Sequence, residues 1–442
     1  MKEHFICSVL IDKELDPLYI NLNAETLKRL NIESNSIILN FGKFKKELTI
    51  EIDNNLKLNQ IKLSSYLNEN ISIPELPYDS FFNKNHLFLG PVIGFLLTPG
   101  YYNNMQEIVK LRFSNYDKIK GLIYIFNRKT INQSNKTISG YYYEPTTNKF
   151  MKGTFPYPCA IYNRSNMKPN IYRHFKKHIG KNIFNYPYRN GNKYSFWHKI
   201  SKIPHIGEHL PITRKYNGVE SLVQMLTKYE SVFLKPTSLS RGRGIFHIEK
   251  ADRGYILSYN TGNKVLIESI ETLEERLNSS IKKNRKYIIQ QEIPSNHSGK
   301  KIDFRLYLQK DETKNWKYSG LETRVAKVGS VITNSSHREK VIPGEVALKE
   351  IYHLSEDQIK QKIVEITQLC INILNVMENA EEAHFGDVAI DLILDKKCKI
   401  WLLEVQRNYA AEKKANWTKS DRRILPYILP TPFEYAKSLA GF

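Results

Sequence analysis

Two acidic side chains stand among apolar residues near the C-terminal end of the sequence. The stretch 386–408, GDVAIDLILDKKCKIWLLEVQRN, alternates on both sides of a lysine-rich turn, which predicts two antiparallel strands. If Asp395 pairs with Ile400, counting along the strands places Asp391 opposite Glu404. Gln406 shares the face of Glu404, because side chains two residues apart on a strand point to the same side. Two carboxylates and an amide oxygen are therefore expected to converge on one patch of sheet.

Three converging hard oxygen ligands suit Mg²⁺, which takes few protein ligands and completes its shell with water and phosphate. The alternative is that both acids face water or pair with Lys or Arg, which is the usual fate of one acid on a strand. Here apolar residues flank both acids, and facing carboxylates repel each other unless a cation lies between them. The sequence therefore favours a metal site. The same alternation predicts that Leu402 lies on the face of Glu404.

Composition limits the class of protein that holds this hairpin. The chain has 442 residues, enough for two or three domains, and 41% of them are hydrophobic. No apolar run approaches the roughly 18 residues of a membrane helix, and a charged residue at Asp12 comes too early for a secretory signal. The four cysteines are scattered, which is typical of reduced thiols in a cytoplasmic protein. No membrane partner is expected.

The formal net charge is +21, which favours an anionic partner such as an acidic peptide, nucleotide phosphates or nucleic acid. Neither zinc-finger spacing nor an RNA-binding aromatic motif is present, and Lys, Asn, Ile and Tyr are abundant in a way that biased genome composition also produces. The charge is therefore only weak evidence for nucleic acid.

Periodicity divides the chain into an N-terminal and a central region. Residues 1–80 predict a small, mostly β module that ends in a proline-containing linker. Residues 86–185 predict an α/β domain, in which 87–100, LFLGPVIGFLLTPG, reads as one buried strand entering a loop. The function of the first module is open.

The region after residue 185 contains a loop suited to phosphate. Residues 232–235, VFLK, predict a strand that ends in Lys235, and PTSLSRGRG follows before a second strand. Such a hairpin can fold over phosphates, because the loop supplies backbone N–H donors and its arginines supply charge. The alternative is a mobile basic hairpin. Farther on, Ser355 and Gln358 form a capping box at the start of a long amphipathic helix.

The order of these parts resembles the ATP-grasp superfamily and, within it, the YheC/YheD group, described as endospore coat-associated proteins. The match covers most residues from about 87 onward and depends on the order of its motifs. These motifs are GPVIGFLLTP, PYPCAIYNR, LPIT, VFLKPTSLSRGRGI, YIIQQEI, KIDFRLYLQKD, ETRVAKVGSVITN and AIDLILDKKCKIWLLEVQ.

The resemblance implies an ATP-grasp fold in which two α+β subdomains, 206–295 and 296–442, clamp ATP. Together with the segment from residue 186 they follow an α/β pre-ATP-grasp domain and the small β module. Three sets of residues match functional positions of the family. Those near nucleotide and phosphates are Lys193, Lys235, Ser240, Gly242, Gly244, Gln291, Glu292, Ile293 and Asp303; those near the transferred group are Arg305, Arg324 and Asn334; the metal ligands are Asp391, Glu404 and Gln406.

The sequence also departs from the family pattern. Asn192 replaces an aspartate before the first phosphate-binding lysine, and Leu239 replaces a glycine of the loop over the phosphates. Gln406 replaces the usual asparagine, which moves the amide oxygen out by one methylene and puts a second metal ion in doubt. The glycine-rich stretch after Asn334 is also absent, so substrate choice is the least transferable property.

The function that the resemblance implies is ATP-dependent carboxylate–amine ligation through an acyl phosphate, with ATP and Mg²⁺ as cofactors. The expected substrate is a peptide or amino acid, and the basic chain favours an acidic one. One alternative is a non-catalytic spore coat or assembly protein with a degenerate ATP-grasp fold. Another is phosphoryl transfer to an acceptor that is not a carboxylate.

Overall fold

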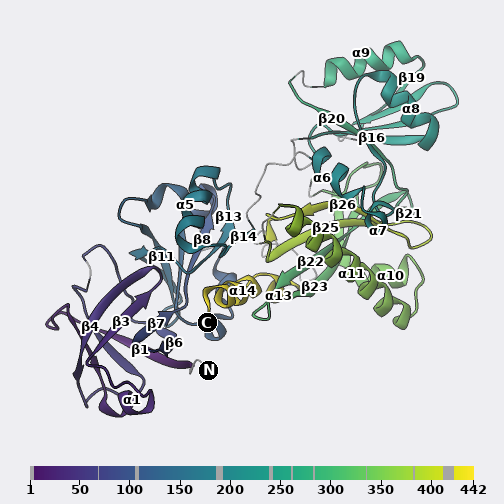
Figure 1. The fold of residues 1–442 in the computed structure, drawn as a ribbon. Helices are drawn as coiled ribbons and strands as arrows, with labels where there is room; N and C mark the ends of the chain where they lie inside the picture. Colours follow the sequence, from purple (N-terminus) through teal and green to yellow (C-terminus); the bar gives the residue numbers. More distant parts are fainter. Residues whose placement is uncertain are drawn as a thin grey trace.

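The chain folds into four β-sheets that follow one another along an elongated molecule (Figure 1). The structure is a computed structural model that describes residues 4–67, 69–104, 109–185, 193–237, 242–259, 262–281, 284–334, 336–381, 384–411 and 423–442. A barrel lies at one end and the sheet that contains β16 and β20 lies at the other. The ring of Phe442 packs against Phe81, with ring centroids 5.2 Å apart, so the C-terminus returns to the barrel.

The N-terminal sheet is a closed seven-stranded barrel in the order β1-β5-β2-β4-β3-β7-β6. Its strands alternate buried and more exposed residues, so one face of each strand fills the interior. The elements are β1 (His4–Asp12), β2 (Tyr19–Leu22), α1 (Ala24–Arg29), β3 (Ser36–Phe41), β4 (Phe44–Ile52), β5 (Gln60–Ser64), β6 (Pro77–Asn83) and β7 (His86–Gly90). The barrel thus extends past residue 80, where the sequence places the end of the first module.

The run 87–100 forms two strands rather than the predicted single strand. β7 ends at Gly90 in the barrel, and β8 (Val92–Leu97) begins in the next sheet. Pro91 has no N–H and cannot continue a ladder of backbone hydrogen bonds. A Cβ atom at Gly90 would lie 2.3 Å from the ring of Phe442, so the C-terminal residue also requires glycine there.

The second sheet has the order β10-β11-β9-β8-β13-β14, with β12 paired to β11. β8, β9, β13 and β14 run parallel, as an α/β domain requires. Its further elements are α2 (Pro99–Asn103), η1 (Lys110–Phe113), α4 (Tyr116–Ile119), β9 (Leu122–Phe126), η2 (Arg128–Thr130), β10 (Ile131–Asn132), β11 (Thr137–Glu144), β12 (Lys149–Pro156), β13 (Ala160–Arg164), α5 (Pro169–Ile179) and β14 (Ile183–Phe184).

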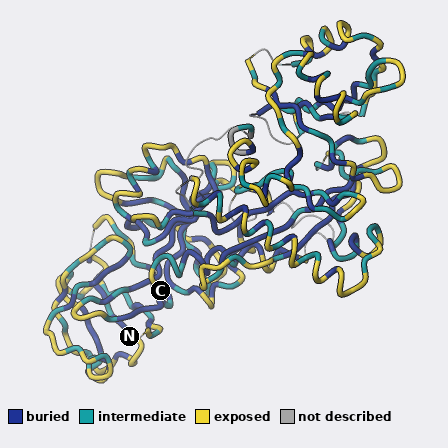
Figure 2. The backbone as a smooth tube through the Cα atoms, turned by 45° about the vertical axis from the view of Figure 1, so that its right-hand side comes forward, coloured by how far each residue is buried: buried dark blue, intermediate teal, exposed yellow. Residues whose placement is uncertain are grey.

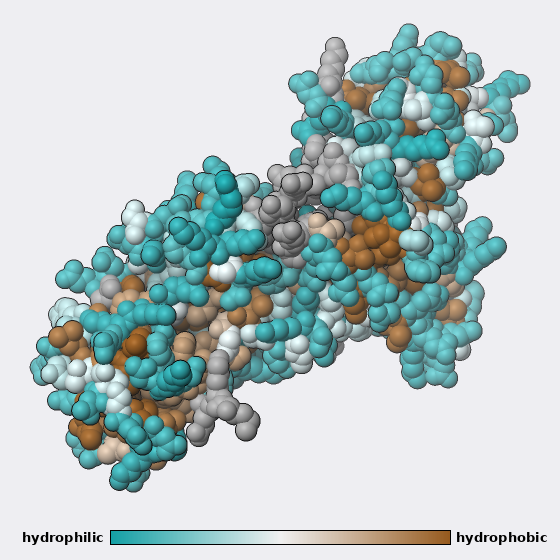
Figure 3. Space-filling model, viewed as in Figure 1, coloured by the Kyte–Doolittle hydropathy of each residue, from teal (hydrophilic) through white to brown (hydrophobic). Residues whose placement is uncertain are grey.

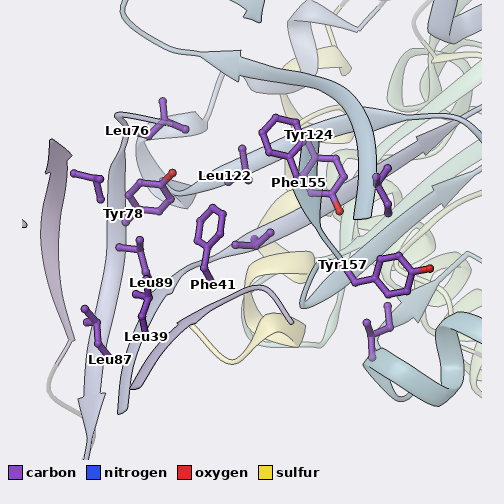
Figure 4. Packing of buried hydrophobic residues seen from close by; sticks show 14 of the residues in the cluster. Leu39, Phe41, Leu76, Tyr78, Leu87, Leu89, Leu122, Tyr124, Phe155 and Tyr157 are labelled. Carbon is purple, nitrogen blue, oxygen red and sulfur yellow. The ribbon is translucent and has the colours of Figure 1, made fainter. Parts of the chain in front are cut away.

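The two faces of this sheet are covered by different parts of the chain. One face packs against Phe175 of α5 and against the barrel in a single core cluster. In Figure 4, Phe41 and Leu89 of the barrel lie beside Leu122 of the sheet. The other face packs against Phe433 of α14 (Thr431–Ala440), the last helix of the chain. Both ends of the sequence are therefore built into the surroundings of the α/β sheet.

The third sheet is antiparallel in the order β15-β20-β16-β17-β18-β19. Two helices cover one face, and Leu222, Met225 and Leu226 of α8 are buried there. The elements are α6 (Lys193–Ile200), α7 (Pro204–Gly207), β15 (Thr213–Lys215), α8 (Val219–Tyr229), β16 (Ser231–Pro236), β17 (Phe246–Lys250), β18 (Tyr255–Tyr259), β19 (Lys264–Ile267), α9 (Ile270–Ser280) and β20 (Tyr287–Gln291).

The fourth sheet has the order β24-β23-β22-β25-β26, with β21 paired to β22. The predicted capping box opens its long helix: the N–H of Ser355 donates to Gln358 Oε1 at 2.8 Å. The elements are β21 (Asn296–His297), β22 (Lys300–Lys310), β23 (Trp316–Ala326), β24 (Arg338–Pro343), α10 (Gly344–Glu350), α11 (Glu356–Glu381), β25 (Asp387–Leu394), β26 (Ile400–Gln406) and α13 (Leu425–Ile428).

Burial follows this organisation (Figure 2). Strands of the second and fourth sheets are buried along the centre of the molecule, whereas helix α9 at the far end is largely exposed. Among the described residues, no helix is both long and apolar enough to span a bilayer.

Candidate active site

The pairing of β25 with β26 places Asp391 opposite Glu404, as the sequence predicts. The route to this pairing differs from the prediction, because Leu394 and not Asp395 pairs with Ile400. The register shifts by one residue between Asp391 and Leu392, a β-bulge that restores the predicted partner.

The bulge also changes the face of one residue. Leu402 is 1% exposed and lies in the core with Ile390 and Leu392, whereas Gln406 lies beside Asp391 on the other face. The prediction that Leu402 shares the face of Glu404 is therefore wrong. The extra residue in β26 breaks the strict alternation on which the prediction depends.

Asp391 is held by two guanidinium groups from neighbouring strands. Arg305 Nε donates to Asp391 Oδ1 at 2.7 Å, and Arg305 Nη2 donates to Oδ2 at 2.9 Å. Arg324 Nη2 lies 3.2 Å from Oδ2. These groups meet because Arg305 pairs with Asp391 across β22 and β25, and β23 carries Arg324 beside them. This bidentate geometry is the strong form of a carboxylate ion pair.

The charge of Asp391 follows from these neighbours. Burial by itself raises the pKa of a carboxyl group, but the two guanidinium groups outweigh burial here and lower the pKa of Asp391 to about 2. Asp391 is therefore an anion at neutral pH, which is the form that binds a metal ion.

The ion-pair chain continues to the next acidic residue. Arg324 donates to both oxygens of Asp303, at 2.6 and 2.7 Å, and the hydroxyl of Thr333 also donates to Asp303. Arg305, Asp391, Arg324 and Asp303 thus alternate in sign along three strands. The four charges therefore balance one another, and Glu404 lies opposite Asp391 on β26.

The third predicted ligand also contacts Asp391. Gln406 Nε2 donates to Asp391 Oδ2 at 2.9 Å. A rotation of the amide by 180° would present its oxygen instead, since nitrogen and oxygen occupy equivalent ends of the group. The chemistry of Asp391, Glu404 and Gln406, two carboxylates and an amide, fits Mg²⁺. A metal ion at Asp391 would share the carboxylate with Arg305, Arg324 and Gln406, which already contact its oxygens.

The glycine loop reaches across to this sheet. Gly242 and Gly244 both have positive φ, +72° and +70°, which favours glycine. A Cβ atom at Gly242 would lie 2.4 Å from Asn334 Nδ2 and 2.6 Å from Ile332 Cδ1. The loop from the third sheet therefore packs directly on the segment that carries Asn334, which follows β23.

Lys235 lies on the face of the third sheet opposite its covering helices. Its Nζ donates to Gln290 Oε1 at 2.7 Å and lies 4.7 Å from the ring centroid of Phe233. Lys301 places its own Nζ 4.7 Å from the same ring. Two ammonium groups and an aromatic ring thus meet on one surface, a suitable environment for phosphates and a flat heterocycle.

The predicted hinge contains a second charged cluster. His247 Nε2 lies 2.6 Å from Glu292 Oε2, and Lys301 donates to the other oxygen of Glu292. Burial opposes ionisation of Glu292, but the hydrogen bond from His247 and the charge of Lys301 hold its pKa well below the ordinary value. Ile293 follows and is buried.

The backbone of the hinge limits how an adenine ring can bind. The N–H of Gln291 donates to Ile212 O at 2.8 Å, and the N–H of Glu292 donates to Ser231 O at 3.2 Å. These two donors are therefore engaged, and an adenine edge would have to use other backbone groups of the hinge.

The side chains of two predicted site residues lie outside the described part of the structure. Lys193 begins α6, but its side chain is not described, and Ser240 lies outside the described residues entirely. The remaining predicted residues fall into two groups. Asp303, Arg305, Arg324, Asn334, Asp391, Glu404 and Gln406 belong to the fourth sheet and its loop, and Lys235, Gly242, Gly244, Gln291, Glu292 and Ile293 belong to the third sheet and its loops.

A buried network that the sequence does not reveal supports the β25–β26 hairpin. Asp387 is fully buried and accepts hydrogen bonds from Gln309 at 2.9 Å, Tyr409 at 2.6 Å and Arg164 at 3.0 Å. Tyr162 donates to it as well. Arg164 and Tyr162 belong to the α/β domain, so this network ties that domain to the strand that carries Asp391. The quoted motifs contain Arg164, but nothing in the sequence pairs it with Asp387.

A groove of about 820 Å³ lies away from these residues, where the segment between β5 and β6 meets β11 and β12. Its lining is mainly hydroxyl and amide side chains, with Glu69 as the charged residue. It contains none of the predicted site residues.

A third sheet that bears a glycine loop, facing a fourth sheet that bears a carboxylate hairpin, has the arrangement of the ATP-grasp class of proteins. The family model for YheC/D-like ATP-grasp proteins matches residues 180–439, so the chain belongs to this family. Over 344 residues it is 22% identical to the endospore coat-associated protein YheD of Bacillus subtilis (strain 168). This alignment covers 74% of each of the two chains.

Solved structures of ligases also align with the chain. The ATP-grasp ligase PsnB, complexed with a phosphomimetic variant of its minimal precursor, Mg and ADP, matches with a TM-score of 0.42 and 10% identity, covering 80% of this chain and 99% of PsnB. D-cycloserine synthetase DcsG matches with a TM-score of 0.42 and 12% identity, over 78% and 98%. The D-alanine-D-alanine ligase from Coxiella burnetii has a TM-score of 0.40 and 10% identity, over 79% and 94%.

Proposed function

We propose that the protein is an ATP-dependent carboxylate–amine ligase. A substrate carboxylate attacks the γ-phosphorus of ATP, ADP leaves, and an acyl phosphate forms. An amine then attacks the acyl carbon, phosphate leaves, and the amine loses a proton to give an amide. The observation that carries the proposal is the meeting of Asp391 and Glu404, opposite each other on β25 and β26, with Arg305 and Arg324.

In the fourth sheet, the acidic residues would bind the metal ion and the arginine would bind anionic oxygens. Asp391, Glu404 and Gln406 would hold Mg²⁺, which neutralises phosphate oxygens as the phosphoryl group moves. With Mg²⁺ held there, Arg305 would turn donors from Asp391 to an anionic phosphoryl or acyl phosphate oxygen. The arginine is already charged and in place, so this exchange would need a side-chain rotation and no proton transfer.

The residues of the third sheet would hold the nucleotide. Lys235 and Lys301 present two ammonium groups beside Phe233, which suits the phosphates and the base. We assign Gly242 and Gly244 to the loop over the phosphates, with Ser240 as a further donor. We assign Lys193 as the first phosphate-binding lysine and Lys235 as the second. Asn334, which packs against Gly242, would close the site from the other side.

The substrate we propose is a peptide or amino acid with an acidic character, because the chain carries a net charge of +21. We place the enzyme in the cytoplasm, with an association with the spore that follows from its relation to YheD. Neither a membrane nor nucleic acid is needed as a partner.

The proposal is tested by trapping the acyl phosphate. Protein, ATP, Mg²⁺, an Asp/Glu-rich peptide and hydroxylamine are incubated, and ADP and peptide mass are measured. A hydroxamate on the peptide, formed in equal amount with ADP, supports ligation. A peptide that gains the mass of a phosphate at Ser or Thr identifies phosphoryl transfer to a hydroxyl instead. ADP formation that no acceptor stimulates contradicts ligation of peptides.

One observation favours the non-catalytic alternative. Asp391 has all its contacts satisfied by Arg305, Arg324 and Gln406 without a metal ion, so the cluster is also stable as a structural ion-pair network. This alternative requires that Mg²⁺ leaves ATP affinity unchanged. Calorimetric titration of ATP with and without Mg²⁺ separates it from the ligase.

A further inference from the structure

The excess of positive over negative charge is concentrated in one segment of the sequence. From Pro145 to Gly207 the sequence contains twelve Lys and Arg residues and no Asp or Glu. The segment includes β12, β13, α5, β14, α6 and α7, so it runs from the α/β domain to the start of the ATP-grasp region. A solvated surface of ordinary composition interleaves both signs of charge, and this segment does not.

Helix α5 gathers these charges on its exposed side. Tyr172, Phe175 and Ile179 are buried, whereas Arg173, Lys176 and Lys177 are exposed. Residues three and four apart lie on one face of a helix, so Arg173 is a neighbour of both lysines. The surface over α5 is hydrophilic in Figure 3, viewed as in Figure 1.

Ordinary helix electrostatics explains only part of this pattern. Cations in the last turn, Lys176 and Lys177, interact favourably with the helix dipole. Lys168 stands at the opposite end, at the N-cap, where a cation is unfavourable, and the first turn has no acid. By contrast, Lys360 and Lys362 on α11 pair with acids of the same helix. Within the described residues, no carboxylate lies at ion-pair distance from the cations of α5.

Neighbouring elements add to this charge. Lys43 donates its N–H to Tyr157 O at 2.8 Å, and the N–H of Tyr157 donates to Lys136 O at 3.2 Å. The hydroxyl of Tyr157 lies 2.8 Å from His174 Nε2 of α5. The turns that carry Lys43 and Lys136 therefore meet α5 at Tyr157.

The surroundings of the two histidines of α5, His174 and His178, do not suit a metal ion. His174 and His178 lie one turn apart, with ring centroids 4.5 Å apart, a spacing that can chelate a transition metal. Burial lowers the pKa of His174, and the neighbouring His178, Lys177 and Lys136 lower it further. The same lysines repel a cation. In the part of the chain that the structure describes, no group of three His, Cys, Asp or Glu residues is placed to hold a metal ion. The surroundings suit an anion.

We infer that the basic face of α5, defined as Lys168, Arg173, Lys176, Lys177 and Lys181, docks an acidic stretch of the polypeptide substrate. This inference rests on the proposed ligase function. An α-helix of 11 residues is about 16 Å long, which an extended peptide spans with about five residues. About five consecutive residues rich in Asp or Glu therefore match the basic face.

The basic face lies next to the segment that enters the β25–β26 hairpin, to which we assign the metal ligands. The carbonyl of Lys181 accepts a hydrogen bond from His384, just before β25. Asn185 Oδ1 accepts from the N–H of Gly386 at 2.9 Å and of Asp387 at 3.2 Å, at the start of the strand that carries Asp391. A peptide held on α5 therefore lies beside the segment that enters β25, the strand that carries Asp391.

The observations favour peptide over nucleic acid. The exposed residues of the basic face include no aromatic side chain on which a base could stack. A ligase of this class also activates a carboxylate, which Asp and Glu side chains supply and nucleic acids lack.

The test measures binding of a fluorescein-labelled decaglutamate peptide by anisotropy at 150 mM salt. The variant is Lys176→Glu/Lys177→Glu. Its control is Lys28→Glu/Arg29→Glu, which changes the net charge equally and also lies in the last turn of a helix, α1. We expect at least a tenfold weaker affinity for the α5 variant and less than a twofold change for the control. Equal affinity of the α5 variant and the unsubstituted chain overturns the inference.

A second arm uses a labelled ten-nucleotide oligo(dT). Binding of this probe as tight as that of decaglutamate, with equal loss in the α5 variant, overturns the assignment to a peptide. The Lys176→Gln/Lys177→Gln variant, expected to show a smaller loss in the same direction, guards against misfolding. Failure of the ligase chemistry is recognised separately, because decaglutamate binding at α5 does not require Asp391 or Glu404. Intact docking in the unsubstituted chain together with absent amide formation would reject the ligase and leave the docking surface standing.

Discussion

The guanidinium of Arg305 contacts both carboxylate oxygens of Asp391, with Nε–Oδ1 and Nη2–Oδ2 distances of 2.7 and 2.9 Å. The carboxylate that we assign to Mg²⁺ is thus neutralised by arginine when no cation is present. We propose that a metal ion and the guanidinium of Arg305 exchange contacts at this carboxylate.

Replacing Arg305 with lysine tests this exchange. Lysine keeps the positive charge but cannot make two parallel hydrogen bonds, so it binds a developing phosphoryl oxygen less well. We expect kcat to fall about a hundredfold, with a change in the KM for ATP below about threefold, since the nucleotide is held by the other sheet. Steady-state ADP formation measures both constants. Arg423→Lys, at a partly exposed arginine that contacts Glu345, is the control. A kcat equal to that of the unsubstituted enzyme would remove Arg305 from the chemistry.

The contact of Gly242 with Asn334 predicts a cost for any side chain at residue 242. In Gly242→Ala the new Cβ lies 2.4 Å from Asn334 Nδ2, and φ is +72°. We expect the loop to move away and the KM for ATP to rise about tenfold, or about 1.4 kcal/mol of binding. Gly299→Ala is a matched control, because its φ is +73° and nothing lies within 4 Å of its Cβ position. Equal effects of the two substitutions would mean that backbone strain alone, and not closure onto Asn334, is responsible.

The Asp387 network predicts a large loss of stability. Asp387→Asn leaves Arg164 buried without its anion, a defect that costs about 3–5 kcal/mol. The midpoint of urea unfolding should fall, and the transition that reports on the fourth sheet should separate from that of the α/β domain. Asp357→Asn, which removes an exposed partner of Lys360, should change the midpoint little. A midpoint unchanged in Asp387→Asn would show that the two domains do not depend on this ion pair.

The lowered pKa of Asp391 predicts a pH dependence of stability. Its folded pKa, about 2, lies below the ordinary value of 3.8, so its contribution is present above pH 3.8 and is lost as pH falls toward 2. The difference in unfolding free energy between the unsubstituted chain and Asp391→Asn should therefore be constant from pH 5 to 8 and shrink below about pH 4. Urea titrations at a series of pH values measure it. A difference that varies between pH 5 and 8 would contradict the assigned ion pair.

Alternation in the local sequence predicted the two antiparallel strands, and counting named Glu404 as the partner of Asp391. The starting pair of that count, Asp395 with Ile400, does not form, and the bulge compensates for it. The bulge between Asp391 and Leu392 was not predictable, and it sends Leu402 into the core. The strand break at Gly90 was missed because the apolar run is continuous, although Pro91 cannot join a ladder and Gly90 must make room for Phe442. The contacts between residues far apart in the sequence could not be predicted. Neither the pair of Arg164 and Asp387 nor the pair of His247 and Glu292 has a signal in the local sequence.

We propose that Asp391 and Glu404 bind the magnesium of an ATP complex. Isothermal titration of ATP in the presence and absence of Mg²⁺ tests this role, with the unsubstituted chain compared with Asp391→Asn/Glu404→Gln and with Glu365→Gln, an exposed acid of α11, as control. We expect Mg²⁺ to strengthen ATP binding in the unsubstituted chain and in the control, and the double variant to lose this effect. ATP affinity that Mg²⁺ strengthens equally in all three would contradict it.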